Sequence, residues 1–150
     1  MKTEKRLDFM DWDECKKSFI RKKEVDNEKI NSMVKTAFKR FNFISSIEVN
    51  KDNVSFVVED YYEIIKELLA SLLLQNGLRS KNHQCLITYF YKTYPNYEFE
   101  ANLILRMSYL RNRLDYYGEL IDINFYKKYS KDFVSIINLI EKLIKEKTKE

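Results

Sequence analysis

Apolar residues recur at spacings of three and four along most of this chain, which is the repeat of a helix with one buried face. The pattern is clearest in the second segment, where Ile30, Met33, Ala37 and Phe41 fall on one side. The helices predicted from the pattern cover residues 8–22, 28–45, 52–76, 82–94, 98–117 and 130–146. The third has the widest apolar stripe, so we expect either a central helix or one shared with a dimer partner.

Glycine and proline mark several of these helix ends. Gly77 and Gly118 follow the third and fifth helices, where glycine adopts the left-handed conformation that ends a helix with little strain. Pro95 disfavours helical conformation in the residue before it. With only two glycines and one proline in 150 residues, a sheet-rich fold is disfavoured. The prediction is one all-α domain, residues 1–150: an up-and-down bundle of five to six helices, with 1–22 as an accessory helix and 23–147 as the core.

Charge and composition limit the classes of function. Lys and Arg number 27 against 23 Asp and Glu, a net charge of +4, which permits an anionic partner but is too small for a dedicated duplex-DNA binder. Residues 78–92 contain Arg79, Lys81 and Lys92 and no acid. No nucleotide-binding glycine motif is present, so no cofactor is predicted.

The two cysteines, Cys15 and Cys85, are far apart in sequence, and there is one histidine, so no metal site is predicted. Neither a secretion signal nor a membrane span is recognisable. We therefore predict a cytoplasmic protein with reduced thiols and no membrane contact, in which Cys85 is a buried helix residue rather than a nucleophile.

The end of the fifth helix carries the densest cluster of polar chemistry. Asn112 and Tyr116 lie one turn apart and project together, whereas Arg111 lies about 140° from Tyr116 around the axis. Arg111 and Asp115 have the spacing of a local ion pair. The segment is therefore either a phosphate-binding site or a salt-bridged, capped helix end.

A second stripe on this helix alternates guanidinium and phenol groups: Arg106, Tyr109, Arg113 and Tyr116. Such a pattern suits single-stranded RNA, because arginine binds phosphate and aromatic rings stack on bases. The alternative is a partly buried seam in which arginine stems cover tyrosine rings.

His83, the only histidine, is expected near the start of the fourth helix, after Arg79 and Lys81. Helix N-termini attract anions, so a phosphate could bind there. The alternative is that Ser80 or Asn82 caps the helix and His83 packs locally. His83 can replace a catalytic histidine only if this loop lies beside Tyr116.

Three features in order resemble the HEPN family of all-α nucleotide- and RNA-associated domains: the helix at 58–63, the loop at 77–83, and Arg111-Asn112 with 116–118. The resemblance extends over about 23–147. It implies a homodimer in which arginine and histidine cleave RNA without metal and asparagine orients them. Arg111 and Asn112 match that motif, and Tyr116 takes the histidine position.

A phenol with an ordinary pKa near 10 is a poor base at neutral pH, so the substitution affects catalysis more than phosphate binding. The leading hypothesis is RNA or nucleotide binding at a dimeric Arg111-Asn112 motif, through the third and fifth helices, with weak or absent nuclease activity. One alternative is an endoribonuclease toxin paired with a nucleotidyltransferase-type antitoxin. The other is a structural dimer or adaptor without a ligand.

Overall fold

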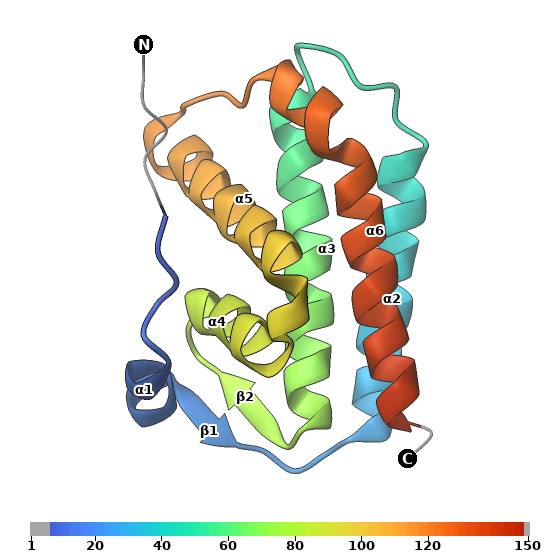
Figure 1. Ribbon diagram of the computed structural model, residues 1–150. Coiled ribbons are helices and arrows are strands. Elements are labelled where there is room, and N and C mark those ends of the chain that lie inside the picture. The colour runs from blue at the N-terminus through green and yellow to red at the C-terminus, as the bar shows by residue number, and fades with distance from the viewer. Residues whose placement is uncertain (1–6, 149–150) are drawn as a thin grey trace.

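The computed structural model describes residues 7–148, and their fold is all-α, as predicted (Figure 1). A short N-terminal helix precedes five longer ones, and a small two-stranded antiparallel sheet joins distant parts of the chain. The helices are α1 (Trp12–Glu14), α2 (Asn27–Ser45), α3 (Val54–Gln75), α4 (His83–Thr93), α5 (Glu98–Tyr117) and α6 (Ile123–Thr148). The strands are β1 (Ile20–Lys22) and β2 (Leu78–Ser80), with a π-helical turn at Cys15–Phe19 and a 3-10 turn at Pro95–Tyr97.

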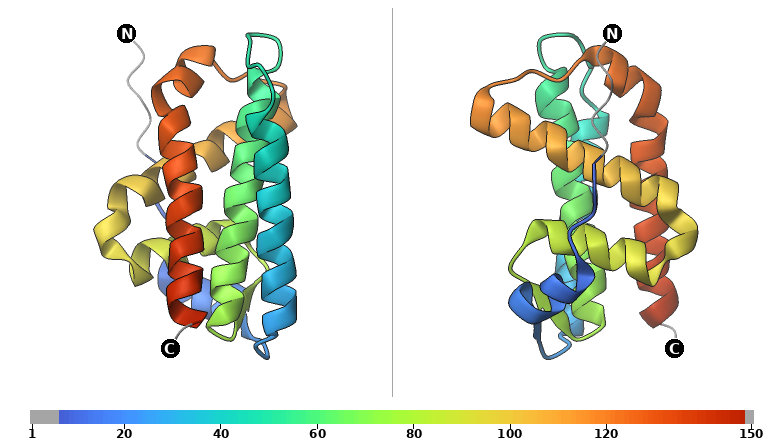
Figure 2. Two further views of the ribbon diagram at one scale, coloured as in Figure 1. Left: turned by 90° about the vertical axis from the view of Figure 1, so that its right-hand side faces the viewer. Right: turned by 60° about the vertical axis from the view of Figure 1, so that its left-hand side comes forward.

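Helix α3 is the centre of the molecule. The long helices α2, α3 and α6 run side by side, while α4 and α5 cross the opposite side of α3 (Figures 1 and 2). The α3 side chains Ile65, Leu68 and Leu72 are fully buried, and they share one core with Phe90 of α4 and Phe133 of α6. The wide apolar stripe of α3 is therefore covered within a single chain.

The predicted helix ends agree closely with the structure in the middle of the chain. Gly77 and Gly118 both have positive φ angles, 72° and 63°, and close α3 and α5 as expected. The last helix begins earlier than predicted, at Ile123, because the Asp122 carboxylate accepts a 2.7 Å hydrogen bond from the Asn124 amide. Phe125 then packs against Phe133 of the same helix.

The predicted helix over 8–22 is wrong at both ends. Residues 8–11 are not helical, and the helical structure runs from Trp12 to Phe19. The chain then continues as β1, which pairs antiparallel with β2, a segment predicted as loop. Ile20 lies opposite Ser80, and the Lys23 amide donates to the Gly77 carbonyl at 2.9 Å. Because the partner strand lies almost 60 residues away in sequence, local periodicity could not predict this pairing.

The expectation of reduced thiols is also wrong. Cys15 and Cys85 form a disulfide with their Cα atoms 5.6 Å apart, and both residues are buried. The bond ties the N-terminal segment to α4, where Thr88 also donates a 2.9 Å hydrogen bond to the Met10 carbonyl. Disulfides persist mainly in oxidising surroundings, so the reduced-thiol argument for a cytoplasmic location no longer holds.

Across residues 7–148, none of the helices combines the length and the apolar character needed to cross a membrane.

Candidate functional site

A pocket of about 290 Å³ lies between the start of α4 and the C-terminal half of α5. It brings together the two sequence features that we singled out, the loop before α4 and the motif on α5. The lining side chains are Tyr62, Lys81, Asn82, His83, Gln84, Ser108, Arg111, Asn112 and Tyr116. We call it the motif pocket.

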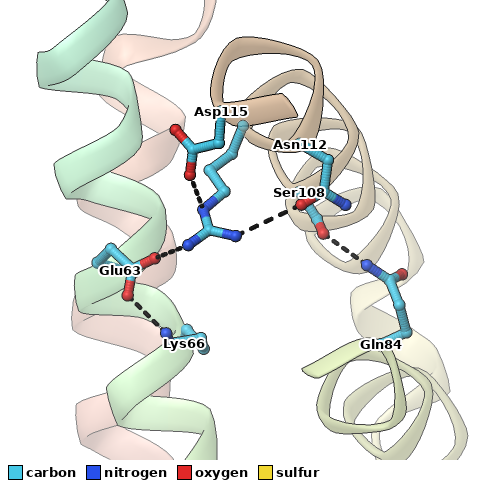
Figure 3. Close-up of polar contacts among 7 residues, drawn as sticks. Glu63, Lys66, Gln84, Ser108, Asn112 and Asp115 are labelled. Atoms are coloured by element: carbon cyan, nitrogen blue, oxygen red, sulfur yellow. Dashed lines mark hydrogen bonds and ion pairs between the residues drawn. The ribbon is translucent and has the colours of Figure 1, made fainter. Parts of the chain in front are cut away.

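Local hydrogen bonds fix the loop that carries His83. Asn82 caps α4, because its side-chain oxygen accepts a 2.7 Å hydrogen bond from the Gln84 amide. The Ser80 hydroxyl donates to the Asn82 carbonyl at 2.7 Å. Gln84 in turn donates to the Ser108 hydroxyl on α5 at 2.6 Å, so the two helices that form the pocket are joined directly beside it (Figure 3).

Arg111 of α5 contacts Glu63 of α3 and, on its own helix, Asn112 and Asp115, and these three partners are labelled in Figure 3. Its Nε lies 3.1 Å from an Asp115 carboxylate oxygen, which confirms the local ion pair, and its Nη2 lies 3.4 Å from Glu63 Oε1. Its Nη1 donates to the Asn112 side-chain oxygen at 3.4 Å. Glu63 is shared, since its other oxygen lies 2.6 Å from the Lys66 ammonium.

These ion pairs do not satisfy the guanidinium fully. Arg111 Nε and Glu63 Oε1 are both buried without a hydrogen-bond partner, because their contacts have the distance of an ion pair but not the directionality of a hydrogen bond. Buried polar groups normally have such partners, and exceptions often mark function. The buried Nε faces Asp115 and is closed to a ligand, so a further acceptor has to approach the guanidinium from the motif pocket, which Arg111 lines.

One carboxylate near Arg111, that of Glu59, carries less than its full negative charge. The pKa of Glu59 is raised to about 7, mainly by burial of its carboxyl group. A hydrogen bond with Asp115 and repulsion from its charge raise the pKa further, while the positive charge of Arg111 lowers it. Glu59 is therefore partly protonated at neutral pH. The reduced negative charge makes the surroundings of Arg111 less repulsive to an incoming anion.

His83 is exposed at the pocket edge, yet its pKa lies below the usual 6.5. Partial burial of the ring is the main cause, followed by the positive charge of Lys66, and Arg111 also lowers the pKa. The imidazole is thus neutral at pH 7 and can accept a proton. On the pocket floor, burial raises the pKa of Tyr62 above 10, so its phenol stays a hydrogen-bond donor.

Comparison with protein-family models, with curated proteins and with solved structures finds no match. The site is therefore interpreted from its own chemistry. Two groups that carry positive charge, Lys81 and Arg111, lie beside a neutral imidazole and several hydrogen-bond donors, a combination suited to a phosphate ester. Within residues 7–148 no group of three or more His, Cys, Asp or Glu side chains could hold a metal ion.

Arg111 and Tyr116 leave α5 in directions about 140° apart, yet both side chains line the motif pocket. The angle around the helix axis describes only where each side chain starts. The long arginine side chain reaches across toward α3, as its contact with Glu63 demonstrates. The loop carrying His83 contributes to the same pocket within one chain, and this was the condition for His83 to replace the missing motif histidine.

Three predicted binding residues do not join the motif pocket. Arg106 lies over the rings of Phe125 and Tyr129 on α6, at 5.4 and 5.9 Å. Arg113 donates to Glu119 at 2.6 and 2.9 Å and stacks on Tyr117 at 4.4 Å. Both arginines of the predicted stripe on α5 therefore contact rings outside it, and Arg79 lines a different pocket.

Sequence reasoning missed the residues that complete the site from other helices. Tyr62 and Glu63 come from α3, and Gln84 and Ser108 form the hydrogen bond between α4 and α5. The spacing of Glu63 and Lys66 indicated an ion pair on one helix. Nothing in a single sequence indicated that Glu63 faces Arg111, because that contact depends on how α5 crosses α3.

Proposed function

We propose that this chain is a HEPN-like protein that binds RNA or nucleotide phosphate in the motif pocket, with Arg111 and Lys81 as the phosphate-binding cations. The observation that carries the proposal is that Arg111, Lys81 and His83 line one pocket. The resemblance of the sequence to the HEPN family supports the same ligand class.

In this proposal a backbone phosphate accepts hydrogen bonds from Arg111, while Asn112 holds the guanidinium in position. Lys81 is exposed at the pocket and has no carboxylate within ion-pair distance among residues 7–148. Tyr116 is 75% exposed, so its ring is available to stack on a base. The carboxylates near Arg111 compete with phosphate, and we expect binding to be weak and salt-dependent.

Single-stranded RNA binding measured over a series of salt concentrations tests the proposal. Lys81→Gln is expected to weaken binding and to reduce the slope of log affinity against log salt by about 1, because one phosphate contact is lost. Lys131→Gln, at an exposed position on α6 outside the pocket, is the matched control and should change neither quantity.

Two results would contradict phosphate binding here. One is the same salt slope for wild type, Lys81→Gln and Lys131→Gln. The other is an Arg111→Ala protein with a lower melting temperature and unchanged RNA affinity, which is the behaviour of a structural dimer or adaptor whose motif only ties helices together.

A second candidate function, metal-independent RNA cleavage, is favoured by the position of His83. A neutral imidazole beside Arg111 can take the proton of a ribose 2′-hydroxyl. The 2′-oxygen then forms a bond to phosphorus and the bond from phosphorus to the 5′-oxygen breaks, with Tyr116 as a proton donor to that oxygen. The products are a 2′,3′-cyclic phosphate and a 5′-hydroxyl.

Cleavage assays in chelator distinguish this candidate from binding alone. His83→Gln should reduce cleavage by roughly 100-fold or more, the usual contribution of a general base, and Arg111→Ala and Tyr116→Phe should also reduce it strongly. Cleavage that persists unchanged in all three variants would point to a contaminating nuclease and rule out this site.

The family resemblance also implies a homodimer that brings two copies of the motif together, and a nucleotidyltransferase-type antitoxin as the partner of an active ribonuclease. The exposed side chains Tyr116, Tyr117 and Leu120 at the end of α5 are compatible with a second copy contacting this end. Because the motif pocket already contains a histidine from its own chain, phosphate binding in this proposal does not require the dimer.

A further inference from the structure

A second pocket, of about 200 Å³, lies on the other side of His83, between α2, α3, β2 and the start of α4. We call it the basic pocket. Its inner wall is aliphatic and includes Met33, Ala70, Leu73, Leu78 and Leu86. No Phe, Tyr or Trp side chain lines it, and His83 is the one lining residue that it shares with the motif pocket, so the two pockets differ in chemistry.

Cations surround this aliphatic wall. Lys23, Lys29, Lys66 and Arg79 line the pocket against a single carboxylate, Glu67. Lys66 is paired with Glu63 at 2.6 Å. By contrast, the structure of residues 7–148 gives Lys23, Lys29 and Arg79 no carboxylate within ion-pair distance. Three cations without counterions therefore lie around an apolar cavity.

Pairing of β1 with β2 holds together two segments that carry these cations and lie far apart in the sequence. Arg79 lies opposite Arg21 in the β1–β2 pair, although both side chains are exposed, and the Lys23 amide binds the Gly77 carbonyl at 2.9 Å. The Arg21 guanidinium donates to the carbonyls of its own segment, and Arg21 does not line the pocket. Arg79 is therefore the arginine of this pair that faces the cavity.

We propose that the basic pocket binds a small amphipathic anion, an aliphatic chain with one carboxylate or phosphate head group. The chain would lie against Leu73, Leu78 and Leu86, and the head group would contact Lys29 and Arg79. The cavity is smaller than the roughly 300–1,000 Å³ typical of drug-sized ligands, so a short chain is expected. This proposal does not depend on RNA binding in the motif pocket.

Isothermal titration of the whole protein with hexanoate, octanoate, octyl phosphate and octanol tests this proposal. Octanoate or octyl phosphate is expected to bind with a dissociation constant of about 1 mM or tighter. Each two-carbon extension from hexanoate should strengthen binding by roughly 15-fold until the cavity is filled, because each buried methylene contributes about a 4-fold gain. Octanol should bind at least about 10-fold more weakly, since it lacks the charge.

The comparison of octanoate with octyl phosphate identifies the preferred head group, and either preference supports the proposal. Lys29→Gln with Arg79→Gln should weaken binding of the preferred anion by about 10-fold or more. The matched control is Lys35→Gln with Lys39→Gln, which removes the same charge from exposed positions on α2 outside the pocket. Ala70→Leu places three more carbons on the pocket wall and should abolish binding in a protein that still melts cooperatively.

Three results would overturn the proposal. They are equal binding of octanol and the anions, equal weakening by the two double variants, and no heat of binding for either anion at millimolar concentration. None of these results bears on the RNA site, because RNA affinity is measured separately and Asn112→Asp, which alters only the motif pocket, should leave octanoate binding unchanged.

Discussion

Replacing Asn112 with aspartate is expected to lower the affinity for single-stranded RNA by about 10-fold or more at low salt. The substitution keeps the shape of the side chain and the acceptor that Arg111 Nη1 contacts at 3.4 Å, so the helix end should stay folded. It adds a full negative charge inside the motif pocket, where a phosphate would bind. Two like charges about 4 Å apart repel by up to about 4 kcal/mol at an effective dielectric constant of 20, and screening reduces this value.

The same helix provides a matched control for this substitution. Asn102 is exposed on α5 and does not line the motif pocket, so Asn102→Asp changes the net charge of the protein equally without changing the site. Fluorescence anisotropy with labelled RNA would compare the two variants with wild type. If both variants lose affinity equally, RNA responds to overall charge, and the motif pocket is not where it binds.

Removing the disulfide is expected to lower the free energy of unfolding by roughly 2–4 kcal/mol. Cys15 and Cys85 are 70 positions apart, and closing a loop of that length removes much conformational freedom from the unfolded chain. Both residues are buried, so alanine is a better replacement than serine, whose hydroxyl would need a hydrogen-bond partner. For a chain of 150 residues we expect a fall in melting temperature of roughly 10 °C.

Thermal melting of wild type with and without reductant, beside the Cys15→Ala/Cys85→Ala protein, measures this effect. Reduced wild type should melt near the double variant, and oxidised wild type should melt well above both. Thiol titration of the denatured, unreduced protein should find no free thiol. Titration of two free thiols in freshly purified protein, together with identical melting curves, would show that the bond does not contribute to the native state.

The sequence was sufficient for the helices whose signals are local. Apolar spacing placed α2 through α5 within a few residues, and Gly118 with Asn82 marked two of their ends correctly. Prediction was wrong where a distant contact decides the structure. Ile20 joins a strand because β2 lies beside it, and Cys15 forms a disulfide because the folded N-terminal segment lies against α4.

The same distinction between local signals and distant contacts applies to the candidate site. Arg111, Asn112 and Tyr116 were identifiable from their order in one helix, and Lys81 and His83 from their position before another. Their meeting in one pocket depends on the crossing of α4 and α5 over α3, which a single sequence does not reveal. Arg113 is the opposite case, a residue that the sequence pattern assigned to RNA binding. In the structure its guanidinium contacts Glu119 and Tyr117 of the same chain.

The most direct test of the central claim uses the only histidine in the chain as a probe of the motif pocket. Proton NMR of His83 would follow its pKa in free protein and with a single-stranded RNA whose 2′-O-methyl groups prevent cleavage. The free pKa should lie below 6.5, because of partial burial and the nearby cations. A bound phosphate should raise this pKa, since it stabilises the imidazolium. An RNA that binds the protein but leaves the His83 resonance and pKa unchanged would contradict phosphate binding at this site.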